Sequence, residues 1–297
     1  MNIFLKKIGI LVISVLILGN LLSYLSLWAL RQGNFYKPSF LVNGVTETDF
    51  DYIVLGASTG LTTLDTQVID SLTHKNGINL SVDDTPISSQ YLMLKHFLAE
   101  GKSTKICVLA PSITAFDDQT NRINANDYRF LPFIDRSYVS DYFQSYSGTD
   151  ARLLSNSRYL PIMGVSYYNA EVFYPSILSV FQPKRRNRFD AKGNYTYPFK
   201  NSNADLIENR NTIRVEFQNT DLKKIKSLCD KEGIVLLCYI SPFKTAKVNT
   251  SNSIYNIINH SDKLLRANYF YDDIHVTSIG RQLISEIFAE DIRPYFN

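Results

Sequence analysis

Three residues of the kinds that cooperate in nucleophilic catalysis lie near opposite ends of the chain. Asp272 precedes His275 by three residues, and Ser58 follows a short apolar run at residues 52–55. An aspartate at this spacing lies about one tight turn from the imidazole, so its carboxylate can orient the ring and stabilise its charged form. A serine hydroxyl becomes a nucleophile when such a base removes its proton. The pattern predicts that Ser58 attacks, that His275 acts as base and then as acid, and that Asp272 holds His275.

The residues around Ser58 predict a strand-to-helix turn. Gly56 and Ser58 follow directly after the apolar run and end the predicted strand. A helix is predicted at residues 63–72. In an α/β protein, a serine at such a turn has its hydroxyl at the carboxyl edge of the sheet and its amide in an anion-binding position. The alternative is that Ser58 is an ordinary N-cap residue. The paired Asp–His signal favours the catalytic interpretation.

The surroundings of His275 predict a loop that leads into the last helix. Thr277 is a good N-cap for the apolar periodicity of residues 278–290. His275 then lies just before a helix, where sheet-based α/β proteins carry working residues. The neighbouring Asp273 competes with Asp272 for contact with the ring, and an ordinary surface histidine is the alternative.

Strand and helix signals alternate along most of the chain. The expected strands are residues 52–55, 78–82, 106–110 and 234–240, and the expected helices are residues 63–72, 88–100, 204–232 and 278–290. The last two strands are continuously apolar, as expected of parallel strands that are covered on both faces. The sequence therefore predicts the α/β class, with a three-layer α/β/α sandwich around a central parallel sheet.

The motifs Gly56-x-Ser58 and Asp272-x-x-His275 at these positions resemble those of the SGNH/GDSL hydrolase superfamily. The chain is most similar to its membrane-anchored, exported branch, which includes the alginate O-acetylation proteins and the D-alanine transfer protein of teichoic acid modification. The similarity covers residues 50–115 and 185–292. It implies a flavodoxin-like SGNH fold and an acyl-serine mechanism that requires no metal and no diffusible cofactor. Within the motif, Ala57 replaces the usual aspartate.

The resemblance also implies an oxyanion hole, and here the sequence departs from the superfamily. The Ser58 amide is the expected first donor. The superfamily adds a glycine after its second strand and an asparagine after its third strand. Residues 79–86 contain no glycine, and residues 109–112 contain no asparagine. Asn79 and Ser112 are therefore the remaining candidates for the second donor.

Residues 8–30 are almost uninterruptedly apolar, and about 20 such residues span a bilayer core. Lys6 and Lys7 precede this run and favour a cytoplasmic N-terminus. We therefore expect residues 1–30 to form an uncleaved signal anchor in the cytoplasmic membrane. A linker at residues 31–50 would follow, and the hydrolase-like domain at residues 51–297 would lie on the extracytoplasmic side. A cleaved signal peptide and a buried core helix are the alternatives.

Residues 116–200 are expected to be an insertion, because they are rich in tyrosine, phenylalanine and proline and lack clear periodicity. Aromatic rings stack on sugars, so the insertion is either a glycan-binding wall or a subdomain whose aromatic residues pack in its own core. The basic run at residues 184–188 either meets phosphate groups or anionic lipid heads, or is a solvated loop.

The composition argues against two kinds of function, nucleic-acid binding and metal binding by cysteines. A formal net charge of +3 is too small to indicate a nucleic-acid partner. No cysteine spacing suggests a metal site, and we expect buried free thiols, although a disulfide remains open because spacing does not decide it. The three cysteines are Cys107, Cys229 and Cys238, and the histidines without an acidic residue at useful spacing are His74, His96 and His260.

Two functions follow from these expectations. The first is a serine esterase or O-acyltransferase that acts on acyl groups, in particular acetyl groups, of cell-envelope or exopolysaccharide glycans. The alternative is a catalytically weak or inactive accessory domain that binds glycan or docks on a multi-pass membrane acyltransferase. The expected partners are an acylated glycan or a lipid-linked acyl donor, such an acyltransferase, and the bilayer through residues 8–30.

Overall fold

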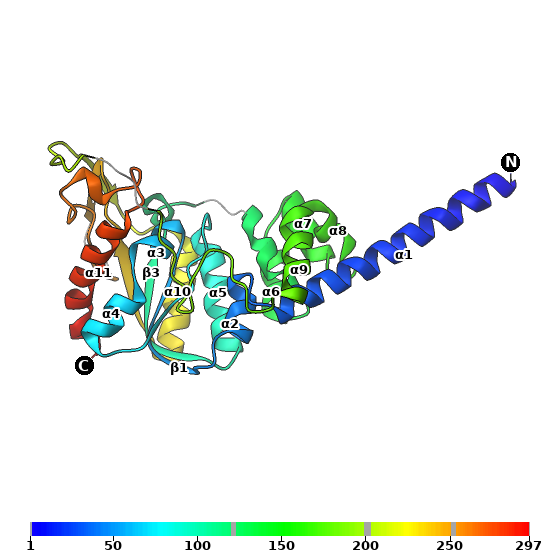
Figure 1. Ribbon diagram of the computed structural model, residues 1–297, viewed down its shortest axis with the longest axis horizontal. Coiled ribbons are helices and arrows are strands. Elements are labelled where there is room, and N and C mark those ends of the chain that lie inside the picture. The colour runs from blue at the N-terminus through cyan, green and yellow to red at the C-terminus, as the bar shows by residue number, and fades with distance from the viewer. Residues whose placement is uncertain (1, 120–122, 199–202, 251–253, 297) are drawn as a thin grey trace. The chain divides into compact units, whose positions relative to one another are not determined.

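The computed structural model describes residues 2–119, 123–198, 203–250 and 254–296 (Figure 1). The chain divides into two compact units, each built from two segments. Unit 1 comprises Met1–Val45 and Asn121–Asn187, and unit 2 comprises Thr46–Thr120 and Arg188–Asn297. Most of the expected insertion at residues 116–200 thus forms one unit together with the N-terminal segment.

The core of unit 2 is a five-stranded parallel sheet, which confirms the α/β class. Its strands lie in the order β2-β1-β3-β5-β7. Their bounds are β1 Asp49–Gly56, β2 Gly77–Asn79, β3 Ser103–Ala110, β5 Val235–Ile240 and β7 Asn256–Asn259. The three longest strands are apolar because their central residues are buried on both faces.

Helices cover both faces of this sheet. The helices α4 (Thr66–Thr73) and α11 (Ser278–Ile292) lie on one face, and α5 (Ile87–Ala99) and α10 (Thr220–Glu232) lie on the other (Figure 1). On the first face, Phe288 packs in a buried cluster with alternate residues of the central strands, which point to the same side. These strand residues are Tyr52, Val54, Ile106, Val108, Leu237 and Tyr239.

Several elements of unit 2 differ from the sequence-based expectation. The strand expected at residues 78–82 is β2, which ends at Asn79. The helix expected at residues 204–232 begins only at Thr220, because residues 211–215 form a strand. This strand, β4 (Asn211–Val215), pairs in parallel with β6 (Ala246–Thr250) in a separate two-stranded sheet. The strand β7 was not expected, since only two apolar residues lie between its terminal asparagines. The remaining elements of unit 2 are α3 (Ser58–Thr63) and the 3-10 helices η1 (Ile113–Phe116), η3 (Ala267–Tyr269) and η4 (Arg293–Phe296).

In its described residues, unit 1 is built from helices. They are α1 (Asn2–Gln32), α2 (Lys37–Asn43), the 3-10 helix η2 (Ala125–Phe133), α6 (Ser137–Gln144), α7 (Thr149–Asn156), α8 (Ile162–Tyr168) and α9 (Ala170–Phe181). The helix α1 packs along α9 and α8. Residues 31–45, expected to belong to a linker, thus include the end of α1 and all of α2.

The helix α1 has two parts with different surroundings. Its apolar stretch, Ile3–Gln32, has the length and composition of a membrane span. An 18-residue apolar part of this stretch is only 6% buried. Near its end, however, Leu27, Ala29 and Leu30 are buried in unit 1. The expected N-terminal apolar helix is therefore present, and its C-terminal end contributes to a folded core.

The aromatic residues of unit 1 mostly pack against one another. The Tyr128 ring lies 4.8 Å from the Tyr168 ring and 5.7 Å from the Tyr36 ring, measured between centroids. Burial is the main reason why the pKa of Tyr36 and that of Tyr168 lie above the usual value. Tyr128 and Tyr168 of the expected insertion therefore pack with Tyr36 of the N-terminal segment in one core. The basic run at residues 184–188 is exposed or half-buried.

The three cysteines are free and buried, as the sequence indicates. Cys107 of β3 and Cys229 of α10 share a hydrogen bond, which together with burial raises the pKa of Cys107 well above the usual value. Burial likewise raises the pKa of Cys238. These thiols therefore serve as small core side chains.

Candidate active site

The structure brings Ser58, His275 and Asp272 together at one end of the sheet of unit 2. Ser58 Oγ lies 2.9 Å from His275 Nε2, and Asp272 Oδ2 lies 2.8 Å from His275 Nδ1. Both distances are those of hydrogen bonds, although Ser58 and His275 are 217 residues apart in the sequence. When Nδ1 donates to Asp272, the neutral ring has a lone pair on Nε2 that accepts the Ser58 proton.

The end of β1 places Ser58 at the carboxyl edge of the sheet. Gly56 lies opposite Ala110 of β3, and a Cβ atom at Gly56 would come within 2.2 Å of the Ala110 carbonyl oxygen. This close approach requires glycine. The Thr59 hydroxyl donates to the same carbonyl oxygen at 3.4 Å. Ser58 is consequently the first residue of α3, where it is half-buried.

This edge of the sheet is also where the strand order changes direction. The chain passes from β1 to β2 on one side of β1, and the following strand, β3, lies on the other side. Ligands of open α/β sheets bind outside the carboxyl ends of the strands at such a switch point. Ser58 directly follows β1, so its hydroxyl lies where the topology predicts a ligand.

The loop before α11 holds His275 with backbone hydrogen bonds. The Tyr271 amide donates to the His275 carbonyl oxygen at 2.8 Å. Thr277 is the N-cap of α11, as predicted, and its hydroxyl accepts from the Gly280 amide at 3.3 Å. A Cβ atom at Gly280 would lie 2.2 Å from the Tyr269 carbonyl oxygen, so glycine is required where α11 passes close to η3.

Asp272 rather than Asp273 contacts the imidazole. Asp272 Oδ1 accepts from the amides of Ile274 and His275 at 2.9 and 2.8 Å, while Oδ2 faces the ring. Burial alone would raise the pKa of Asp272, but the hydrogen bonds from the ring and the two amides outweigh it and lower the pKa. The carboxylate is therefore ionised at neutral pH. Asp273 accepts through its backbone carbonyl oxygen from the Lys244 amide at 3.0 Å.

The three residues expected in the oxyanion hole have different surroundings. The Ser58 amide begins α3 and so has no acceptor within that helix. The Asn79 side chain is fully buried, and its amide donates to the carbonyl oxygens of Gly60 at 3.0 Å and Leu64 at 3.4 Å. Asn79 thus stabilises α3 and the residue that follows it. Ser112 lies two residues beyond β3 and is half-buried, and its hydroxyl lies 3.5 Å from that of Thr114.

The turn after β2 takes a glycine-like conformation without a glycine. Asp84 has a φ of 57°, which is in the left-handed region that non-glycine residues seldom adopt. The preceding part of this segment is tied to β1, because the Val82 amide donates to the Gly56 carbonyl oxygen at 3.0 Å. Aspartate is one of the residue types that tolerate this conformation.

A segment with two tyrosines, Tyr195 and Tyr197, passes beside His275, and no pattern in the sequence assigns a role to Tyr197. The Tyr197 ring centroid lies 5.0 Å from that of His275, and it stacks on Tyr271 at 4.5 Å with an interplanar angle of 13°. Tyr195 meets Tyr197 edge-on at 5.5 Å. Burial raises the pKa of Tyr197, and nearby Tyr195 and Asp272 raise it further. Neutral aromatic rings therefore line one side of the imidazole.

The turn at residues 190–194 anchors this tyrosine segment. Asp190 accepts from the amides of Lys192 and Asn194 through one carboxylate oxygen, at 2.8 Å each. The buried Asn194 side chain accepts from the Thr66 amide at 3.2 Å, and the Lys192 ammonium lies 3.0 Å from the Asp70 carboxylate. The residue types at positions 190–195 predict a turn from the sequence, and Tyr197 lies two residues beyond it.

Of the remaining histidines, His260 has a partner that the sequence does not indicate. No acidic residue lies at useful spacing from His260 in the sequence, but its Nε2 lies 2.8 Å from Asp291 Oδ2. The two residues are 31 positions apart and meet only through the tertiary fold. Within the described ranges, no group of three or more His, Cys, Asp or Glu residues is arranged to hold a metal ion.

Comparison with known proteins adds no family assignment. The chain has no significant match to a protein-family model or to a curated protein. The geometry of Ser58, His275 and Asp272, together with the sequence patterns that carry them, is therefore the basis for inferring a function.

Proposed function

We propose that the protein is an SGNH-type serine esterase or O-acyltransferase. The observation that carries this proposal is the continuous hydrogen-bonded chain from Ser58 Oγ through His275 to Asp272. The strand order and the helices on both faces support a three-layer, flavodoxin-like α/β/α arrangement. In such an arrangement, the nucleophile after β1 and the base before the last helix meet at the switch point of the sheet.

In the first half of the reaction, Ser58 Oγ forms a bond to the acyl carbon of an ester while His275 Nε2 takes the hydroxyl proton. The carbonyl oxygen becomes an oxyanion, which the Ser58 amide stabilises together with the Ser112 hydroxyl. The bond from the acyl carbon to the alcohol oxygen then breaks, and His275 returns its proton to that oxygen. The products are a free alcohol and an acyl ester on Ser58.

In the second half, water or a sugar hydroxyl attacks the acyl carbon of acyl-Ser58. His275 takes the proton of the attacking group and gives it back to Ser58 Oγ as the bond to serine breaks. Asp272 remains ionised throughout and stabilises the imidazolium that forms in each half. Hydrolysis and transfer differ only in which hydroxyl attacks acyl-Ser58.

The location of the site suggests where its substrates are found. Lys6 and Lys7 precede the apolar run of α1 at residues 8–30, so the N-terminus is on the cytoplasmic side and unit 2 is extracytoplasmic. The protein is then a single-pass protein of the cytoplasmic membrane. Its substrates are acyl groups, in particular acetyl groups, of cell-envelope or exopolysaccharide glycans. A lipid-linked acyl donor and a multi-pass membrane acyltransferase are the expected partners.

Covalent labelling of Ser58 tests the proposed mechanism. The full chain in detergent is treated with a serine-reactive phosphonate, and the labelled peptide is identified by mass spectrometry. We expect one label at Ser58 that is absent in Ser58→Ala, together with release of acetate from a small acetate ester by the unsubstituted protein. Ser155→Ala, which alters a serine of unit 1, is the matched control and should keep both properties.

The opposite results would favour the accessory function. If Ser58 is not labelled, no ester is turned over and Ser58→Ala leaves glycan acylation in cells unchanged, the enzymatic proposal fails. The protein would then be a glycan-binding or docking component of an acylation machinery. The Ser58–His275–Asp272 arrangement would in that case serve structure alone.

A further inference from the structure

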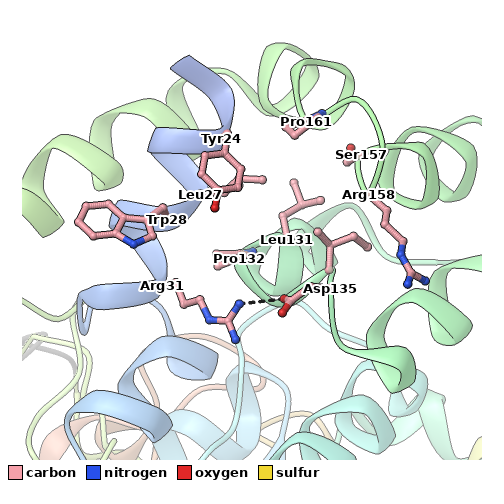
Figure 2. Close-up of a pocket in the computed structure, with 11 residues that line it drawn as sticks. Tyr24, Leu27, Trp28, Arg31, Leu131, Pro132, Asp135, Ser157, Arg158 and Pro161 are labelled. Atoms are coloured by element: carbon pink, nitrogen blue, oxygen red, sulfur yellow. Dashed lines mark hydrogen bonds and ion pairs between the residues drawn. The ribbon is translucent and has the colours of Figure 1, made fainter. Parts of the chain in front are cut away.

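Unit 1 contains a cavity of about 340 Å³ beside α1 (Figure 2). One wall is a single face of α1, with residues at helical spacing. The opposite walls come from the end of η2 and from the turn between α7 and α8. The lining residues are Tyr24, Leu27, Trp28, Arg31, Leu131, Pro132, Ile134, Asp135, Ser157, Arg158 and Pro161.

The cavity has an apolar body and a charged end. Leu27, Leu131 and Ile134 are buried apolar side chains of its walls. At one end, the Arg31 guanidinium lies 2.9 Å from the Asp135 carboxylate, as Figure 2 shows. This ion pair uses one nitrogen of Arg31, whose guanidinium has further N–H donors. An amphiphile with a long apolar part and an anionic head has the same distribution of polarity.

The sequence of α1 sets the depth of this cavity in a bilayer. About 20 residues cross the hydrocarbon core, and counting from Ile8, just after the lysines at positions 6 and 7, places the outer boundary near Leu27. Tyr24 and Trp28 are 60% and 53% exposed on either side of this level. Both residue types are typical of membrane–water interfaces. Arg31 then lies at the depth of the lipid headgroups.

A hydrogen bond to Asn20 places part of unit 1 below the outer boundary of the hydrocarbon core. The Ile162 amide donates to Asn20 Oδ1 at 3.3 Å, which fixes the turn between α7 and α8 beside the middle of α1. Asn20 precedes Leu27 by seven residues, so this contact lies about 10 Å below the outer boundary. The neighbouring Tyr159 and Leu160 are 76% and 50% exposed. Such exposure is favourable in lipid and unfavourable in water.

We propose that this cavity is a binding site for one phospholipid of the outer leaflet. An acyl chain occupies the space between α1 and η2, and the phosphate reaches Arg31 at the charged end. The inference rests on α1 spanning a bilayer and is independent of any chemistry at Ser58. A bound lipid would fill the space between the membrane anchor and the rest of unit 1.

Photo-crosslinking tests the site. The full chain is reconstituted in nanodiscs with phosphatidylglycerol that carries a diazirine in one acyl chain, and labelled peptides are mapped after irradiation. We expect labels at residues 131–135 and 157–161 at least several-fold above those at residues 123–130. Diacylglycerol with the same chains lacks the phosphate and should label these positions less. Labels confined to α1, with none in the opposite walls, would overturn the proposal because they report only bulk lipid.

Lipid retention provides a second measurement with a matched control. The chain is exchanged into lipid-free detergent, and phosphate is measured per protein. We expect Trp28→Ala combined with Arg31→Gln to retain about 10-fold less lipid than the unsubstituted chain. Tyr174→Ala changes an exposed tyrosine of unit 1 outside the cavity and should retain the unsubstituted amount.

Equal loss in both variants, or no loss in either, would contradict the site. A photoreactive residue at position 24 that captures a second protein in native membranes, and no lipid, would also contradict it. In that case the cavity would be a docking site for a protein partner.

Discussion

Unit 1 and unit 2 expose large apolar side chains in different ways. In unit 1, those outside α1 gather mainly on the turn between α7 and α8 and on α8 and α9: Tyr159, Leu160, Tyr167, Tyr174, Ile177, Val180 and Phe181. In unit 2, the exposed ones are scattered over separate elements and loops: Leu72, Leu206, Val235, Ile254, Leu265 and Ile279. Single exposed apolar residues are normal in water, whereas a gathered set indicates an apolar environment or partner.

One aspartate in each unit shows a second difference. In unit 1, Asp127 is fully buried and accepts from the Tyr142 hydroxyl at 2.8 Å and from the Asn124 amide at 3.1 Å. In unit 2, Asp272 is 46% exposed in its side chain while it holds His275. Buried polar networks fix a fold, whereas accessible ones can meet a substrate. In the functions proposed above, chemistry belongs to unit 2 and membrane contact to unit 1.

The strongest test of this division is a double substitution in unit 2. Ser58→Ala and His275→Ala should each lower ester turnover by at least about 1000-fold, and the combined change should be hardly worse than either one. The reason is that His275 has no hydroxyl proton to take once Ser58 is gone. The loss of ester turnover in Asp272→Ala should be about 100-fold smaller than the loss in either of these variants, because the imidazole can still act as a base. Turnover is measured with a small acetate ester.

The control for this cycle lies in unit 1. Tyr174→Ala changes an exposed residue of α9 and should leave turnover unchanged. Losses of Ser58 and His275 that multiply would mean that the two residues act independently. A comparable loss in Tyr174→Ala would mean that the division of labour between the units is wrong.

The next effect in size concerns the two parts of α1. Leu30 is 2% exposed, whereas Leu16 is 50% exposed on the same helix. Leu30→Ala should lower the free energy of unfolding of unit 1 by about 2–5 kcal/mol, since it leaves a cavity in a packed core. Leu16→Ala should leave it nearly unchanged in detergent. Limited proteolysis at residues 123–187 measures the difference, and equal protection in both variants would show that α1 is an anchor only.

The sequence predicted those features that local patterns carry. Continuous apolar runs marked β3 and β5, and Thr277 marked the start of α11, because burial and capping select residue types directly. The spacing of Asp272 and His275 likewise anticipated their contact. The 2.9 Å approach of Ser58 to His275 was an inference from topology, since it depends on two elements meeting across the sheet.

Other features depend on tertiary contacts that local patterns do not record. The sequence predicts helix where strand β4 lies, because the pairing partner of β4, β6, lies more than 30 residues later. The partition of the insertion was not predicted, because the core of unit 1 includes Leu27 and Leu30 from a helix expected to be membrane-bound throughout. Asn79 was expected at the oxyanion hole, whereas its side chain amide holds the carbonyl oxygens of Gly60 and Leu64.

A smaller effect is expected at the tyrosines beside His275. The apolar face of a pyranose stacks on aromatic rings, so Tyr197→Ala should raise the KM for an acetylated oligosaccharide about 10-fold, which corresponds to about 1.4 kcal/mol. Tyr197→Phe keeps the ring and should resemble the unsubstituted protein. Turnover of a small acetate ester should change less than about twofold. Equal slowing of both substrates would mean that Tyr197 acts by holding His275 and not by binding sugar.

The smallest expected effect is a pH dependence of unit 2 that arises from His260. This side chain is 1% exposed and lies edge-on to Tyr239 at 5.2 Å between ring centroids. Burial lowers the pKa of His260 below 6.5, and the hydrogen bond to Asp291 offsets this only in part. Below pH 6.5 the unfolded state therefore binds the proton more readily than the folded state, so stability falls as the pH is lowered.

A substitution at His260 isolates this contribution. One proton accounts for at most about 1.4 kcal/mol per pH unit, so the slope that His260 adds below pH 6.5 stays under this bound. His260→Gln keeps a donor for Asp291 and does not titrate, so hydrogen-exchange protection of β5 and α11 should fall less steeply with pH than in the unsubstituted chain. His74→Asn is the matched control, because His74 is exposed and asparagine tolerates its φ of 58°. If His74→Asn flattens the profile as much as His260→Gln does, the pH dependence does not come from the buried imidazole.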